Sequence, residues 1–335
     1  MIRLVRVELT RLRKRRAVVV LLLVALIAPL LVAALVAWST RPVSAAETAR
    51  ARAQVQRELS SRSFDRMIEE CAAAPRDWGV RAEPDTDDAR AQCLEQNRPR
   101  VEWYLARPPL RWGDQLATAG MVLSLVTVLM MLAATTFIGH DWNSGSMSNQ
   151  LLFEPRRLRV FVAKALAVVL LALLASALAL ALLWGGIGLT AYLRDIDPHG
   201  EVVDRIWQSG LRGVVFVAAA ALGAFAVTNL FRSTVFTLGA MFAVVVLSSV
   251  LLVMLPFPDA QRFSLPVNVG AWVGGKATYY REVAQTCFSG PRPPEGMDCK
   301  EYGVVTLWES ARYFGSMLVL AVGLSAWSFR RRDVP

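Results

Sequence analysis

The chain has 335 residues, of which 55% are hydrophobic and 19% are charged. A water-soluble protein of this length carries more charge, so the composition excludes an ordinary soluble enzyme and indicates a membrane protein. The net charge of +10 would also suit nucleic-acid binding, but the distribution of the basic residues gives a simpler explanation.

Charge-free apolar runs predict an all-α polytopic protein with six transmembrane helices. The first run, 17–38, would span roughly 33 Å at about 1.5 Å per residue, enough for a hydrocarbon core of about 30 Å. It is longer than the apolar part of a cleaved signal peptide, so we expect it to be retained. The other spans are predicted at 116–138, 165–192, 213–231, 233–257 and 313–329. Arg232 alone separates the fourth from the fifth, which predicts a tight helical hairpin.

The basic residues predict the orientation in the membrane. With both termini in the cytoplasm, the inner parts are 1–16, 139–164, Arg232 and 330–335, and they hold fifteen basic and four acidic residues. The remaining parts hold nearly equal numbers of each. This positive-inside bias predicts an even number of spans in the inner (plasma) membrane, with both termini cytoplasmic. Anionic lipid headgroups then account for the basic excess without a nucleic-acid partner.

Residues 1–16 combine apolar and basic positions before the first span. The apolar positions partly fit one face of a helix, although the alternation at the start also fits a strand. We expect a basic amphipathic helix, containing Arg6 and Glu8, that lies on the inner leaflet. A simple topology anchor is the alternative, and the segment could serve as both.

The first extracytoplasmic segment is predicted at 39–113. Residues 47–71 are rich in Ala, Arg, Glu and Gln, which favours a helix. Residues 85–88 offer capping groups for a second short helix that runs through Cys93. We therefore expect a helical hairpin, and its role stays open between a substrate gate, a receptor for a partner and a stalk.

All four cysteines fall in segments predicted to lie outside: Cys71, Cys93, Cys287 and Cys299. Disulfides persist on that side of a membrane and are rare in the cytosol. Four cysteines allow three pairings, and the local one joins Cys71 to Cys93 and Cys287 to Cys299. Metal binding is the rival interpretation, but no CxxC motif and no nearby histidine supports it, so we expect no metal site.

The inner stretch 139–164 differs from an ordinary loop. It places Trp142, Leu151, Leu152 and Phe153 next to a basic cluster, with Gly145 and Pro155 as helix breakers; the basic residues are Arg156, Arg157, Arg159 and Lys164. An amphipathic segment between helix breakers predicts a short helix on the cytoplasmic face. A cytoplasmic partner could bind it, or it could be a connector held at the headgroups by Trp142 and the arginines.

Two further outer segments are predicted, a short loop at 193–210 and a longer segment at 258–312. The second contains a near match to a phosphate-binding loop, from Gly270 to Ala277. Ala277 replaces the hydroxyl residue that would bind magnesium, no strong strand precedes the motif, and the topology places it away from ATP. We therefore reject a nucleotide site there. A partly buried or re-entrant piece is possible in the first half of this segment.

The chain lacks the residues that drive transport or catalysis in a membrane. No span interior contains Asp, Glu, Lys, Arg or His, which ion-coupled pumps need at depth. No catalytic motif occurs, so we expect no catalytic residue, and an intramembrane enzyme is disfavoured. The cytoplasmic parts are too small for a nucleotide-binding domain. Any uphill transport must therefore take its energy from a separate subunit, and 139–164 is the largest inner surface available to bind it.

The arrangement of the whole chain resembles the permease subunits of type-2 ABC exporters, especially those of actinobacteria. The family shows an acid, a Gly-Thr pair, a leucine pair, a proline with basic residues, and a lysine that opens the third span. The corresponding residues here are Asp141, Gly145-Ser146, Leu151-Leu152, Pro155-Arg156-Arg157 and Lys164. Asp replaces the usual Glu and Ser the usual Thr, and both changes are conservative. The opening Val5 to Leu9 also resembles the start of the family, where Glu8 commonly occurs.

The resemblance implies that this inner segment is the coupling helix that docks on an ABC ATPase. It also implies a pairing with a second permease copy or a paralogue, with ATP and magnesium bound by the ATPase and no cofactor on this chain. Membrane lipids would be the remaining partners. The alternative is a non-transporting sensor, anchor or immunity protein whose outer segments bind a ligand or partner. An ATPase partner distinguishes the two hypotheses.

Overall fold

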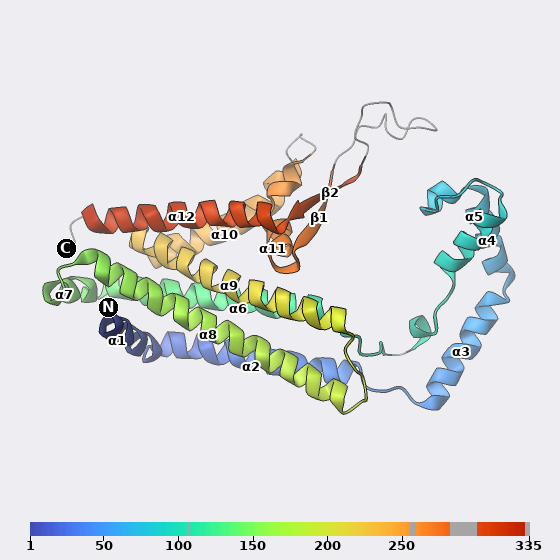
Figure 1. Ribbon diagram of the computed structural model, residues 1–335, viewed down its shortest axis with the longest axis horizontal. Coiled ribbons are helices and arrows are strands. Elements are labelled where there is room, and N and C mark those ends of the chain that lie inside the picture. Colours follow the sequence, from blue (N-terminus) through green and yellow to red (C-terminus); the bar gives the residue numbers. More distant parts are fainter. Residues whose placement is uncertain (106, 255–258, 282–299, 332–335) are drawn as a thin grey trace. The chain divides into compact units, whose positions relative to one another are not determined.

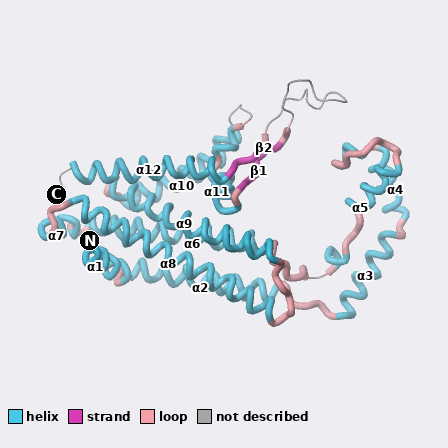
Figure 2. The backbone as a smooth tube through the Cα atoms, viewed as in Figure 1, coloured by secondary structure: helices cyan, strands magenta, loops and turns pink. Residues whose placement is uncertain are grey.

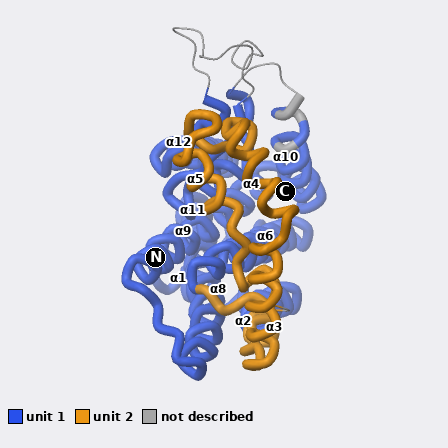
Figure 3. Tube along the Cα trace, turned by 90° about the vertical axis from the view of Figure 1, so that its right-hand side faces the viewer, with its two compact units in different colours: residues 1–33, 112–335 blue, residues 34–111 orange. Residues whose placement is uncertain are grey.

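The computed structural model describes residues 1–105, 107–254, 259–281 and 300–331, and helices predominate in it (Figures 1 and 2). The chain divides into two compact units, which Figure 3 colours separately. Unit 1 comprises Met1–Ala33 and Trp112–Pro335, and unit 2 comprises Ala34–Arg111. The predicted pair Cys287 and Cys299 lies outside the described residues, as do the end of the predicted fifth span and the last four residues of the tail.

Unit 1 is a helical bundle in which α9 packs against α6, α8 and α12. The helices that begin in this unit are α1 (Ile2–Arg13), α2 (Arg16–Ser39), α6 (Gln115–Asn143), α7 (Ser146–Phe153), α8 (Arg157–Tyr192), α9 (Gly200–Phe231), α10 (Thr234–Met254), η3 (Ala260–Phe263), α11 (Leu265–Gly274) and α12 (Leu307–Arg331). Many small residues of α6, α8 and α9, such as Ala133, Ala167 and Ala221, are buried where these helices meet. Small side chains permit the close helix packing that membrane bundles rely on.

Four helices among the described residues are long and apolar enough to cross a membrane: α2, α6, α8 and α9. They correspond to the first four predicted spans, and the mostly helical membrane fold is confirmed to that extent. The apolar part of α10 is described as a shorter segment, Thr234–Ser248, and α12 has 25 residues that include several polar ones. The fifth and sixth spans therefore stay predictions.

The connection between α9 and α10 matches the predicted tight hairpin. Arg232 has a left-handed backbone conformation, with φ of 56°, and it ends α9 directly after Phe231. In contrast, the predicted loop at 193–210 is helical from Gly200 onwards, because α9 begins well before its apolar run. Polar residues such as Glu201 are compatible with a helix, so the helix does not stop where the apolar run ends.

A small sheet, which the sequence analysis did not foresee, precedes α12. Strand β1 (Lys276–Tyr280) pairs antiparallel with β2 (Tyr302–Thr306). The helix α11 leads into β1 through Gly275, whose φ of 89° favours glycine. A helix followed by a strand is the reverse of the strand–loop–helix order of a phosphate-binding loop, which agrees with the rejection of that motif.

The start of α12 carries a reciprocal cap. The Thr306 backbone N–H donates to Glu309 Oε2 at 2.8 Å, and the Glu309 N–H donates to Thr306 Oγ1 at 3.4 Å. This is a capping box, which satisfies backbone donors that the first turn of a helix leaves unpaired. Arg262 of η3 also pairs with the Glu309 carboxylate, at 2.5 Å. The cap therefore fixes the point at which the sheet passes into the helix.

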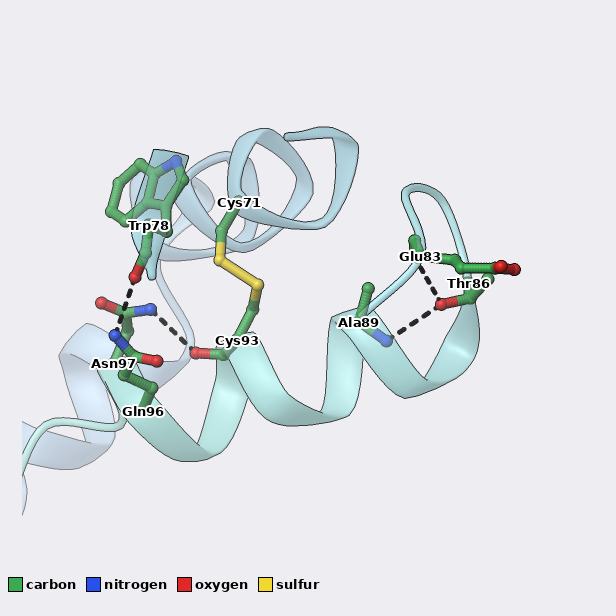
Figure 4. The surroundings of a disulfide bond; sticks show 8 residues. All are labelled: Cys71, Trp78, Glu83, Thr86, Ala89, Cys93, Gln96 and Asn97. Atoms are coloured by element: carbon green, nitrogen blue, oxygen red, sulfur yellow. Dashed lines mark hydrogen bonds between the residues drawn. A yellow bond between two sulfur atoms is a disulfide. The ribbon is translucent and has the colours of Figure 1, made fainter. Parts of the chain in front are cut away.

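Unit 2 is a small helical unit closed by a disulfide bond. Its elements are α3 (Ala45–Leu59), α4 (Arg62–Ala73), η1 (Pro75–Trp78), α5 (Asp87–Asn97) and η2 (Val101–Tyr104). Cys71 of α4 and Cys93 of α5 are bonded, with Cα atoms 6.1 Å apart (Figure 4). Thr86 caps α5 by accepting a hydrogen bond from the Ala89 N–H at 3.1 Å. The predicted cap and this disulfide are present, and the hairpin consists of α4 and α5. The helix predicted over 47–71 is instead two helices, α3 and α4, because the chain turns at Ser60 and Ser61.

Candidate functional site

The segment that connects α6 to α8 contains a short helix at one end of unit 1. The helix α6 ends at Asn143, and Gly145 then adopts a left-handed conformation with φ of 67°. The helix α7 follows over Ser146–Phe153, and α8 begins two residues after Pro155. Figure 1 shows α1, α7 and the end of α12 at the same end of the bundle. The breakers seen in the sequence thus mark the turns on both sides of α7.

The tip of α7 presents apolar side chains to the surroundings. Leu152 is 80% exposed and Phe153 is 91% exposed, whereas Met147 at the start of the helix is buried. Pro155 and Arg156 are also exposed, and Leu151 and Arg157 are partly buried. The two adjacent side chains form a small apolar patch that either a partner protein or the headgroup layer of the membrane could cover.

Beneath this tip, three charged residues from three helices meet in the interior. Glu8 of α1, Asp141 of α6 and Lys164 of α8 are each at most 1% exposed. Lys164 Nζ lies 2.9 Å from Glu8 Oε2 and 2.5 Å from Asp141 Oδ2. Asp141, which the sequence analysis assigned to the docking surface, therefore lies inside the protein and pairs with residues of its own chain.

Four further polar residues close the network around these charges. Arg11 donates to Glu8 at 3.2 Å and to Gln150 Oε1 at 3.1 Å, and it also contacts Asp141 and Ser146. Arg15 pairs with Asp141, and Gln150 Nε2 donates to Glu8 Oε1 at 2.5 Å. The sequence analysis missed Arg11, Arg15 and Gln150. The spacing of Glu8 and Arg11, three residues apart on one helix, was an available signal.

These residues form the Glu8–Lys164 network, whose charges nearly balance, with two carboxylates against three cations. A buried charge is costly unless it is paired and hydrogen-bonded, and each of these groups has at least one oppositely charged partner. Arg11 and Arg15 remain 30% and 18% exposed, so they lie between the buried acids and the outside. Arg6, by contrast, is on the exposed side of α1.

Trp142 links the same end of the bundle to α9 and α12. Its Nε1 donates to Asn229 Oδ1 at 3.2 Å, and Asn229 Nδ2 donates to Ser325 Oγ at 3.0 Å. The indole ring also packs edge-on against Phe329, and the Arg232 guanidinium lies 4.3 Å above it. Trp142 is thus partly buried against its own chain, and Asn229 is a buried polar residue that the sequence analysis did not single out.

The described residues contain no group of three or more His, Cys, Asp or Glu side chains able to hold a metal ion. Neither the curated proteins nor the solved structures gave a match to this chain. A comparison with protein-family models, however, matches residues 6–334 to the family described as ABC-2 family transporter protein. The match covers nearly the whole chain, including most of α1, the Glu8–Lys164 network and α7, and we conclude that the protein belongs to the ABC-2 family of transporter proteins.

Proposed function

We propose that this chain is the membrane-spanning permease subunit of an ATP-driven exporter and that α7 is where a separate ABC ATPase docks. Membership of the ABC-2 family supports the permease role and implies an ATPase partner in general. The observation that carries the docking proposal is the exposed tip of α7, Leu152 and Phe153. ATP and magnesium would bind to the ATPase, and this chain would need no cofactor of its own.

The surroundings of the tip favour a protein partner of a particular chemistry. Arg156 and Arg159 are exposed and follow Leu152 and Phe153 closely in the chain. An apolar anchor flanked by arginines suits an apolar groove with an acidic rim, because charge complementarity guides encounter and buried apolar side chains supply affinity. Of the predicted coupling residues, Leu152, Pro155 and Arg156 would contact the ATPase. Asp141, Trp142 and Ser146 would instead hold α7 in place.

We further propose six spans with both termini in the cytoplasm of a cell whose plasma membrane holds the protein. The basic segments that carry the positive-inside bias include α1, the start of α8 and the end of α12, and these lie at one end of unit 1 (Figure 1). The disulfide-bonded unit 2 follows the opposite end of α2, where an oxidising compartment would preserve the bond. Two such subunits, identical or related, would enclose the transport path.

The test is binding of the ATPase to a variant with an altered tip. The Leu152→Ala, Phe153→Ala variant should lose about 3 kcal/mol of binding energy, roughly a hundredfold in Kd, because buried apolar anchors dominate such interfaces. The ATPase is first identified by mass spectrometry of the complex purified with the wild-type chain, and its affinity for each variant is then measured in nanodiscs.

The matched control is Tyr192→Ala, Leu193→Ala. This pair is similarly exposed, at 80% and 72%, but lies at the other end of α8. The control should bind the ATPase as the wild type does. Unchanged affinity in the tip variant would show that α7 is not the dock. A wild-type chain that purifies with no ATPase would contradict the permease proposal itself and favour a sensor or anchor.

A further inference from the structure

Side-chain contacts connect the short helix α7 to the long helix α8. The backbone of α7 packs chiefly against α6, while α1 packs extensively against α8. A displacement of the α7 tip can therefore reach α8 along the chain through Pro155, through α6, which packs against both helices, or through contacts that α1 provides. The N-terminal helix α1 is therefore one of the elements that connect α7 to α8.

Glu8 of α1 is the point at which these contacts meet. Its Oε1 accepts a hydrogen bond from Gln150 Nε2 of α7 at 2.5 Å, and its Oε2 accepts one from Lys164 Nζ of α8 at 2.9 Å. The two oxygens of one carboxylate thus face two different helices. Glu8 is fully buried, so water does not compete for either contact.

From this geometry we infer that Glu8 is a positioning residue that fixes α7 relative to α8, so that α1 transmits motion of the docking helix into the spans. The inference rests on the proposed function, because it assigns to α1 a part in coupling beyond anchoring the chain to the inner leaflet. Lys164 extends the linkage to α6, because it also pairs with Asp141 at 2.5 Å. The basic residues on the exposed side of α1, such as Arg13, take no part in it.

The hydrogen-bond pattern provides a matched set of variants. Glu8→Gln replaces one acceptor oxygen by a donor, which faces either Gln150 Nε2 or the Lys164 ammonium in this arrangement, because the Gln150 oxygen already accepts from Arg11. The double variant Glu8→Gln, Gln150→Glu restores the contacts with α7 and α8, because the amide at position 8 accepts from Lys164 and donates to the carboxylate at position 150. The net charge of the double variant is that of the wild type. Arg13→Gln removes a charge from the exposed side of the same helix and serves as the control.

The measurement is the distance distribution between spin labels on α7 and α8 in nanodiscs, without any ATPase. Labels on genetically encoded amino acids at Asn149 and Leu174, both exposed, leave the cysteines untouched. The distribution should broaden about twofold in Glu8→Gln, because a short helix that has lost a fixing contact samples more orientations. It should be narrow in the double variant and in Arg13→Gln.

A wild-type distribution in Glu8→Gln, or a double variant as broad as the single one, would overturn the inference. If Glu8→Gln does not fold, Gln150→Ala decides instead, because it removes only the α7 side of the linkage and should broaden the distribution. With the ATPase bound, trapping by vanadate should shift the wild-type distance, and the shift should be smaller in Glu8→Gln at equal ATPase occupancy. Absence of any ATPase binding would contradict the proposed function while leaving the label distances interpretable.

Discussion

Unit 2 and the Glu8–Lys164 network of unit 1 hold helices together by different means. In unit 2, α4 and α5 are joined by the Cys71–Cys93 bond over a small apolar core that includes Phe64 and Ile68. In unit 1, charged and amide side chains join α1, α6, α7 and α8. A covalent bond keeps one arrangement, whereas ionic partners can exchange. The difference is the one that the proposed function requires, in which unit 2 lies outside the cell and the ionic contacts lie where the ATPase docks.

The largest expected effect comes from removing Lys164, the central cation of the Glu8–Lys164 network. Lys164→Met should destabilise unit 1 by about 3 to 5 kcal/mol, because it leaves two buried carboxylates with reduced compensation. Thermal unfolding of the purified protein, followed by size-exclusion chromatography, measures the loss. Lys276→Met, at an exposed position of β1, is the control and should unfold as the wild type does. Equal unfolding of the two variants would show that the network contributes little to stability.

Reduction of the disulfide should affect the other region alone. The Cys71→Ser, Cys93→Ser variant should destabilise unit 2 by about 3 kcal/mol, because the bond closes a loop between cysteines 22 residues apart. Hydrogen exchange should rise in α4 and α5 and stay unchanged in α6. Added reductant should reproduce the effect in the wild type. Faster exchange in α6 would mean that the two units depend on each other for stability.

Steric packing beside the network gives a third, smaller effect. A Cβ atom at Gly139 of α6 would lie 2.0 Å from Thr234 Cγ2 at the start of α10, so Gly139→Ala should cost about 1 to 3 kcal/mol. Adding Thr234→Ser removes that methyl group and should restore most of the loss. Gly120→Ala, on the same helix in open space, is the matched control. Thermal unfolding of the three variants checks the order, and a neutral Gly139→Ala would show that Thr234 gives way at no cost.

The smallest expected effect concerns pH at the start of α12. The Thr306 backbone N–H, then its hydroxyl, lowers the pKa of Glu309 below its ordinary value. A carboxylate whose pKa is lower in the folded state adds stability above its unfolded pKa, and this contribution is lost as pH falls through the folded value. Hydrogen exchange at β2 and the first turn of α12 should therefore rise on acidification below about pH 4.5. In Glu309→Gln, hydrogen exchange at these residues should no longer rise on acidification. A rise equal to that of the wild type would show that Glu309 does not cause it.

The sequence by itself determined the features that local chemistry fixes. Apolar runs gave the long helices α2, α6, α8 and α9, and capping groups near Thr86 gave the start of α5. Cys71 and Cys93 could be paired because nearby helices in one segment bring their cysteines together. Gly145 and Pro155 marked the limits of α7, because these residues disfavour a continuous helix.

Only the tertiary structure decided which polar residues meet. Glu8, Gln150 and Lys164 come from three helices and are separated by up to 156 residues, so no local pattern could place them together. Packing of the helices buries Asp141, which was predicted to lie on a docking surface, and leaves Phe153 exposed. Burial is a property of packed helices rather than of residue type, and charged groups enter the interior only where the fold supplies their partners.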